Sequence, residues 1–495
     1  MRAWKWALPA TTLAVFLIQY VIQPATIYPG DAEAIRMEAS YLVAHGQLGI
    51  PVASPAAKDI APELIPPLAK EDQYFWLNHE RQAYFARWGV GNTIMFAIPL
   101  LFSNPDPRGA RLQVLNLYNA ALTALLVAGI LFACMRGGMK VRVAVPFALA
   151  WLYSSYILYY ARMQSAEIIQ CVLIVWAFAA FREANMRLGA GRSAGGALVA
   201  MNLLLALLTL AKIQFVTAWV LALICLFARR RTRSDLWGSA LVLAAAGAAQ
   251  LGVDAWKFGS PFEIGKLGYP FPHATAGWGF SVREYVSSIP DFVWGARGSV
   301  LRFAPLMLVA VLGVTGTIRR SPREAAFVWG TFLANVLIAG ATINHNGEWS
   351  IGPRYLVQSV ALLAVPAAGV FAAWADSARP MRVRALAWAG LAAAVLIGMP
   401  DEANACFFSP FAAHQTENIL RAGPLPPEGA AYFDHASRFE VLRDLRAFCE
   451  NQESPVTAIF AGEMRQVGPE NATRALTAIR AYCTPNLALF PHLRG

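Results

Sequence analysis

The stretch YPGDAEAIRMEASYLVAHGQLGIP, residues 28–51, decides how this chain is organised. It follows the first long apolar segment, and Asp31 stands where the N-cap of a helix is expected. One apolar stripe at helical spacing follows, made of Ala34, Met37, Tyr41 and Leu42. The stretch therefore predicts a short amphipathic helix along a membrane face, with two acids, Asp31 and Glu33, at its start and Gly46 near its end.

The composition places this stretch in a membrane protein. Of the 495 residues, 57% are hydrophobic and only 14% are charged, whereas soluble domains have about a quarter charged residues. Apolar runs of about 17 to 23 residues recur and are bounded by basic clusters. The net charge of +11 lies in these short loops, where Lys and Arg set topology, and so it does not indicate binding to nucleic acid. We expect an all-α polytopic protein.

Eleven membrane-spanning helices are expected, with the N-terminus and every basic cluster on the cytoplasmic side. They are placed at about residues 6–23, 112–134, 143–160, 166–181, 195–211, 213–228, 236–256, 300–318, 325–341, 355–374 and 385–399. The apolar run at 90–102 has about 13 residues, too few to span, and is expected to lie in the interface.

This topology predicts two domains. A transmembrane domain at residues 1–399 would carry outer loops at 24–111 and 257–299. A small periplasmic or extracellular domain at 400–495 would follow it. The expected location is the cytoplasmic (inner) membrane of the cell envelope, with the C-terminus outside.

Ionisable residues outside the basic clusters gather at the predicted outer ends of the helices. They are Asp31, Glu33, His79, Glu80, Arg87, Arg162, Glu167, Lys212, His345, Glu348 and Arg354. Transporters and proton pumps usually place such residues at mid-membrane, and many show internal repeats. Neither feature is visible here, so the pattern indicates a site at the outer surface.

Six short motifs follow one another along residues 1–400. They are GDAE at Gly30–Glu33, RWGVG at Arg87–Gly91, YAR with a later Glu at Tyr160–Glu167, Lys212 at a helix turn, FGSP at Phe258–Pro261 and GPRY at Gly352–Tyr355. In this order the chain resembles the GT-C class of polytopic glycosyltransferases, which use lipid-linked sugars and include protein O-mannosyltransferases and the aminoarabinose transferases of lipid A. Two features depart from the class: Ala32 separates acids that are often adjacent there, and the tail after Pro400 matches no motif of the class.

The resemblance implies transfer of a sugar, with inversion, from a polyprenyl phosphate or diphosphate to an acceptor hydroxyl or amine outside the membrane. An acceptor hydroxyl needs a base, which a carboxylate can provide. A phosphate leaves without protonation, but its charge needs Arg, Lys or a divalent metal. The implied partners are the lipid-linked donor, a glycan, lipid or protein acceptor, and membrane lipids, without nucleic acid. The metal requirement stays open between none and a divalent cation such as Mg²⁺ or Mn²⁺.

Within this scheme Asp31 is the expected catalytic base, with helix capping as its alternative role. Arg354, Lys212 and Arg87 are expected to bind the donor phosphate. Supporting or metal-side roles fall to Glu33, Glu167, Arg162, Glu348 and His345.

Several of these residues have structural alternatives. Lys212 at a tight turn is equally well explained by snorkelling to lipid head groups, and Glu167 by a solvated helix start. Arg354 begins a helix, where a cation opposes the macrodipole and calls for an anion, either a phosphate or Glu348. For the whole chain, the alternatives to an enzyme are a transporter or flippase of lipid-linked glycans and a non-catalytic membrane scaffold.

Overall fold

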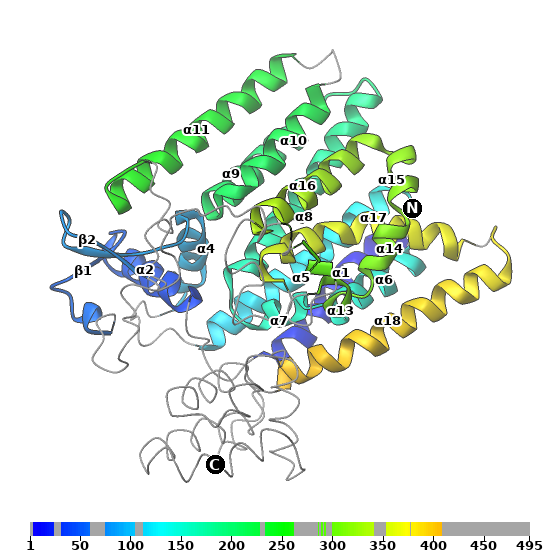
Figure 1. Cartoon of the computed structure of the whole chain (residues 1–495), viewed down its shortest axis with the longest axis horizontal. Coiled ribbons are helices and arrows are strands. Elements are labelled where there is room, and N and C mark those ends of the chain that lie inside the picture. Colours follow the sequence, from blue (N-terminus) through cyan, green and yellow to red (C-terminus); the bar gives the residue numbers. More distant parts are fainter. Residues whose placement is uncertain are drawn as a thin grey trace, which may run out of the picture.

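The computed structural model describes residues 3–23, 31–59, 75–103, 112–227, 233–261, 286, 289–290, 292–293, 299–340, 353–376 and 378–407. The predicted C-terminal domain therefore lies almost wholly outside the described residues. The described chain is a bundle of helices with one small sheet at one end (Figure 1).

The helices, in chain order, have the following bounds. They are α1 Ala3–Val21, α2 Asp31–His45, α4 Val90–Leu100, α5 Leu112–Arg136, α6 Val141–Tyr153, α7 Ile157–Arg162, α8 Ala166–Gly189, α9 Gly195–Ala211, α10 Val216–Phe227, α11 Arg233–Phe258, α13 Val300–Phe303, α14 Met307–Leu312, α15 Val314–Arg320, α16 Pro322–Gly340, α17 Val357–Ala375 and α18 Met381–Phe407. Short 3-10 turns are η1 Pro55–Asp59, η2 Ile213–Phe215 and η3 Arg354–Leu356.

Among the described helices, four are long and apolar enough to cross a membrane. They are Gln113–Arg136, Trp237–Phe258, Arg354–Ala375 and Met381–Met399. Four shorter apolar helices accompany them, at Val90–Leu100, Val141–Tyr153, Gly195–Ala211 and Ile213–Leu226. These helices fit an all-α membrane protein, while the count of eleven spans stays a prediction.

Two of the predicted spans are broken, which corrects their expected bounds. The run at 143–160 divides into α6 and α7, and the run at 300–318 divides into α13, α14 and α15. The breaks contact each other, because the backbone N–H of Tyr156 donates to the carbonyl of Phe303 at 2.9 Å. Each break leaves backbone N–H and C=O groups without partners in a helix, and such groups need hydrogen bonds inside a membrane protein. This bond pairs one N–H of the first break with one C=O of the second. Pro305, which lacks an N–H, lies in the break between α13 and α14 and favours it.

The first loop contains a three-stranded antiparallel sheet that sequence reasoning missed. Its order is β1 (Ile50–Pro51), β3 (Ala83–Ala86), β2 (Phe75–Asn78). The register pairs Ile50 with Tyr84 and Trp76 with Phe85. Its aromatic side chains pack on the end of α11: the Phe85 and Trp256 rings lie 5.0 Å apart, and those of Trp76 and Phe258 lie 5.8 Å apart.

Helix α2 forms as predicted, but its surroundings differ from the prediction. Ala34, Met37 and Tyr41 of the expected stripe are buried against the sheet rather than against a membrane face. The other side is also buried, since Ile35 and Ala39 join the main core of the bundle. Helix α2 is therefore held between two cores, with α4 beside it.

Helix α8 connects two charged ends of the bundle. At its C-terminal end Glu183 pairs with Arg136 of α5 and with Arg187, and Arg182 pairs with Glu324 of α16 at 3.3 Å. Glu167 lies at the other end, about 24 Å away at 1.5 Å per helical residue. This second end includes α2, α4 and the sheet, and we call it the α2 end (Figure 1). The basic loops that bound α5, α8 and α16 thus meet at one end, and the acids and amides of the candidate site meet at the other.

Candidate functional site

Three charged residues interact at the α2 end of the bundle. Arg354 Nε of η3 lies 2.6 Å from Glu167 Oε1 at the start of α8. The Glu167 side chain is 7% exposed and that of Arg354 is 23% exposed. Lys212, in the turn between α9 and η2, acts electrostatically on the same carboxylate. Its Nζ lies 5.1 Å from the ring centroid of Tyr355. We call these three the Glu167 cluster, and sequence reasoning had named each of them as a site residue.

The turn that carries Glu167 is tightly anchored. Gln164, between α7 and α8, has a φ of +52°, a conformation that non-glycine residues seldom adopt. Its side chain accepts from Arg36 of α2 at 2.7 Å and donates to Asn116 of α5 at 2.7 Å. Asn119 adds a bond to the backbone carbonyl of Ala161 at 2.6 Å. These partners from two helices hold a backbone conformation that costs of order 1–3 kcal/mol and so fix where α8 begins.

The RWGVG motif positions Lys212. A Cβ added to Gly91 would lie 2.5 Å from the backbone nitrogen of Ala211, and one at Gly89 would meet a carbonyl oxygen of α9. Both glycines are needed because α4 begins directly against the last turn of α9. Asn92 then donates to the carbonyl of Ala211 at 2.9 Å. The residue that follows is Lys212, so this contact sets where the lysine leaves α9.

The two other cations named from sequence have backbone partners. Arg87 is buried beside the sheet, where its Nε donates to the carbonyl of Phe75 at 3.0 Å and its guanidinium lies 5.3 Å from the Trp76 ring centroid. Arg162 is also buried and donates through Nε to the carbonyl of Ile22 at the end of α1. The structure therefore brings Arg354 and Lys212 to Glu167, and it places Arg87 on the sheet and Arg162 against α1.

Asp31 is the first residue of α2, and its side chain lies outside the described residues. Glu33 follows in the first turn and acts electrostatically on Arg36. Burial lowers the pKa of the Arg36 guanidinium to about 10, with the charge of Glu33 working in the opposite direction. Arg36 thus stays protonated at neutral pH and ties α2 to the turn before Glu167. Glu348 and His345 lie outside the described residues.

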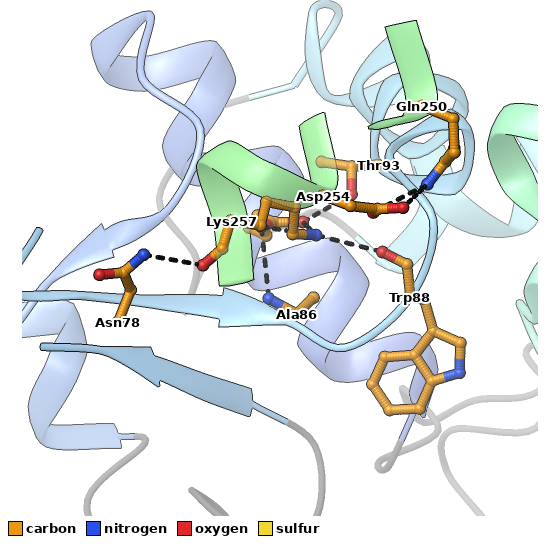
Figure 2. Close-up of polar contacts among 8 residues, drawn as sticks. Asn78, Ala86, Trp88, Thr93, Gln250, Asp254 and Lys257 are labelled. Atoms are coloured by element: carbon orange, nitrogen blue, oxygen red, sulfur yellow. Dashed lines mark hydrogen bonds and ion pairs between the residues drawn. The ribbon is translucent and has the colours of Figure 1, made fainter. Parts of the chain in front are cut away.

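A second charged cluster, which Figure 2 shows, was not predicted from the sequence. Glu38 of α2 and Lys257 of α11 are both buried, with Nζ 3.3 Å from Oε1. The Thr93 hydroxyl donates to Glu38 at 2.7 Å, the backbone N–H of Ala86 donates to it at 3.3 Å, and Lys257 donates to the carbonyl of Trp88 at 3.1 Å. This ion pair is buried, and removing either partner would leave an uncompensated buried charge, which is strongly destabilising. The pair joins α2, α4, α11 and the sheet.

Within the described ranges, no group of three or more His, Cys, Asp or Glu side chains lies close enough to hold a metal ion.

Comparisons with known proteins bear on the fold. No protein-family model matches the chain, and no curated protein matches its sequence. Solved structures do match. The oligosaccharyltransferase of Archaeoglobus fulgidus, tethered to an acceptor peptide with an NVT sequon, is 14% identical with a TM-score of 0.51. The match covers 88% of this chain and 59% of that one, so the chain spans under two thirds of the archaeal enzyme's length.

Two further structures show weaker similarity. ArnT from Cupriavidus metallidurans, bound to undecaprenyl phosphate, is 14% identical with a TM-score of 0.47, over 97% of this chain and 76% of that one. The archaeal oligosaccharyltransferase AglB with an inhibitory peptide and a dolichol-phosphate is 13% identical with a TM-score of 0.48, over 88% and 60%. Only the match at 0.51 bears on the fold: the chain has a fold similar to that of the archaeal oligosaccharyltransferase, as the resemblance of its motifs leads us to expect.

Proposed function

We propose that the chain is a membrane glycosyltransferase that moves a sugar from a polyprenyl-phosphate carrier to an acceptor on the outer side of the cytoplasmic membrane, with inversion at the anomeric carbon. The observation that carries this proposal is the Glu167 cluster, in which Arg354 contacts the carboxylate and Lys212, from a distant segment, acts electrostatically on it. The likeness to structures solved with undecaprenyl phosphate and dolichol-phosphate agrees with such a donor.

The charges of the cluster favour a phosphate. Arg354 and Lys212 carry two positive charges and Glu167 carries one negative charge, so the three residues of the cluster together carry one positive charge. A phosphate compensates it through charge-assisted hydrogen bonds, which are roughly twice as strong as neutral ones. Glu167 engages the Nε edge of Arg354 and so holds the planar guanidinium in one orientation.

Asp31 is proposed as the base. The bond between Arg36 and Gln164 supports this assignment, because it ties α2 to the turn that precedes Glu167. Asp31 begins the same helix, about 7.5 Å along the axis from Arg36. In the proposed step the acceptor oxygen bonds to the anomeric carbon while the bond from that carbon to the phosphate oxygen breaks. Asp31 takes the acceptor proton, and Arg354 and Lys212 stabilise the departing phosphate.

The test uses the purified full chain in nanodiscs with polyprenyl-phosphate sugars that differ in the sugar. An enzyme should bind one donor and release polyprenyl phosphate when an acceptor is added. Binding without turnover for every acceptor class, together with movement of donor between leaflets, would favour the flippase alternative. Binding of no donor would favour a scaffold. Mass spectrometry of cell-envelope glycans with and without the protein would identify the sugar and the acceptor.

A further inference from the structure

Three buried amides form a directed chain close to the Glu167 cluster. Gln358 of α17 donates to Gln170 of α8 at 2.6 Å, and Gln170 donates to Asn92 of α4 at 3.2 Å. Asn92 donates in turn to the carbonyl of Ala211 at 2.9 Å, at the end of α9. All three amides are at least 97% buried. The chain therefore crosses the bundle from α17 to α9 without reaching solvent.

Two of the amides lie about one helical turn from a charged residue, and the third contacts the residue before Lys212. Gln170 follows Glu167 by three residues on α8, and Gln358 follows Arg354 by four residues where η3 continues into α17. Residues three or four apart lie on the same face of a helix. At the other end Asn92 holds Ala211, the residue directly before Lys212. The amides thus join the three elements that carry the cluster, with α4 between α8 and α9.

We propose that Asn92, Gln170 and Gln358 are positioning residues that set the separations of Lys212, Glu167 and Arg354 and so shape the site to one phosphate group. The proposal rests on the proposed function in one respect, that the anion is a polyprenyl phosphate. Its physical basis is the lengthwise alignment of the helices that carry the amides. Buried amides are costly without partners. Sliding any one helix by a turn would therefore leave a hydrogen-bond donor and a hydrogen-bond acceptor unpaired in an apolar interior. Apolar side chains of the same size would tolerate such a slip.

The same bundle offers a matched control. Asn202 of α9 accepts from the Trp219 indole at 2.8 Å and donates to Ser239 of α11 at 2.7 Å. It is a buried amide that joins three helices, as the amides near the cluster do. It lies about 15 Å along α9 from Lys212. Losing Asn202 should therefore cost similar stability without changing the geometry of the cluster.

The test compares Gln170→Met, Asn92→Ala, Gln358→Met and the Asn92→Ala/Gln170→Met pair with Asn202→Ala. Undecaprenyl phosphate is titrated into each full-length protein in detergent, and amide hydrogen exchange is followed in the peptide that covers residues 212–215. Each single variant near the cluster should weaken binding about tenfold, and the pair should weaken it little more than either single change, because one broken link disconnects the chain. Exchange at residues 212–215 should rise in the same variants. Asn202→Ala should lower the melting temperature similarly and change neither readout.

The outcomes separate this inference from the proposed function. In turnover the variants near the cluster should raise the donor KM more than they lower kcat, which a general loss of folded protein would not do. Equal weakening by Asn202→Ala, or wild-type binding and exchange in Gln170→Met and Gln358→Met, would overturn the positioning role. If the wild-type protein binds no undecaprenyl phosphate while exchange at residues 212–215 still responds as expected, the positioning role stands and the proposed donor is wrong.

Discussion

At the scale of single residues, the candidate site contains one observed ion pair, Glu167 with Arg354, and one base, Asp31, that is proposed from the sequence. Glu167 and Arg354 are far apart in the chain but in contact in the fold. A buried carboxylate paired in this way can hold an arginine for a ligand, or it can simply be neutralised by it. Binding and stability must therefore be measured separately to decide between the two roles.

The first prediction concerns Asp31. Asp31→Asn should lower turnover by at least about 100-fold, because an amide cannot take the acceptor proton. Donor binding and melting temperature should stay near those of the wild type, since Asn suits a helix start about as well as Asp. Rates and donor titrations on the same preparation provide the check. Near-normal transfer by a stable Asp31→Asn protein would mean that the base must be sought at Glu33 or Glu167.

The second prediction concerns Arg354. Arg354→Met should destabilise the protein by about 1–3 kcal/mol, because the buried Glu167 carboxylate loses its hydrogen-bonded partner and keeps only the electrostatic effect of Lys212. Adding Glu167→Gln should restore much of that stability, since the buried carboxylate charge is gone. Donor binding should stay weak in both variants, because the phosphate has lost its arginine. Thermal unfolding and donor titration measure the two effects. A double variant that regains stability and also normal binding would show that Arg354 serves structure alone.

At the scale of elements, the contact between α4 and α9 positions Lys212. The third prediction is that Gly91→Ala destabilises the protein by about 1–3 kcal/mol, as overpacking does, and weakens donor binding as well. The added Cβ would meet the backbone of Ala211, which cannot move out of the way as a flexible side chain can. Gly252→Ala in α11 is the control, because a Cβ there meets no atom within 4 Å. Thermal melts and donor titrations should separate the two glycines, and equal effects would argue against this contact.

At the scale of the whole molecule, α8 runs from the α2 end of the bundle to the end that carries the basic loops. The fourth prediction is that the α2 end faces outward, because basic loops stay in the cytoplasm. In a background with Cys406, Cys449 and Cys483 changed to Ser, Gln82→Cys should react with an impermeant maleimide on intact cells. Arg192→Cys should react only after the membrane is opened, and both positions are exposed in the fold. The opposite labelling would place the Glu167 cluster inside and remove the case for an outer site.

Much of the local structure follows from the sequence alone. Apolar runs and basic clusters predict a helical membrane protein, and Asp31 and the spacing after it predict α2. The short run that forms α4 is recognisable from its length. Three members of the polar set, Glu167, Lys212 and Arg354, do lie together in the fold. The helix predictions succeed because hydrophobic period and run length act over a few helical turns, while the roles of the polar residues stay predictions.

Only the tertiary structure decided which distant residues meet. The pairing of Glu167 with Arg354, the ion pair of Glu38 with Lys257, and the facing breaks at Tyr156 and Phe303 all join separate segments. The strands of the first loop have two to four residues, too few for alternation to show. Their pairing depends on packing against α2 and α11. Local patterns determine where most of the helices form, but the partner of a buried charge depends on how the helices pack, because that packing decides which groups leave water together.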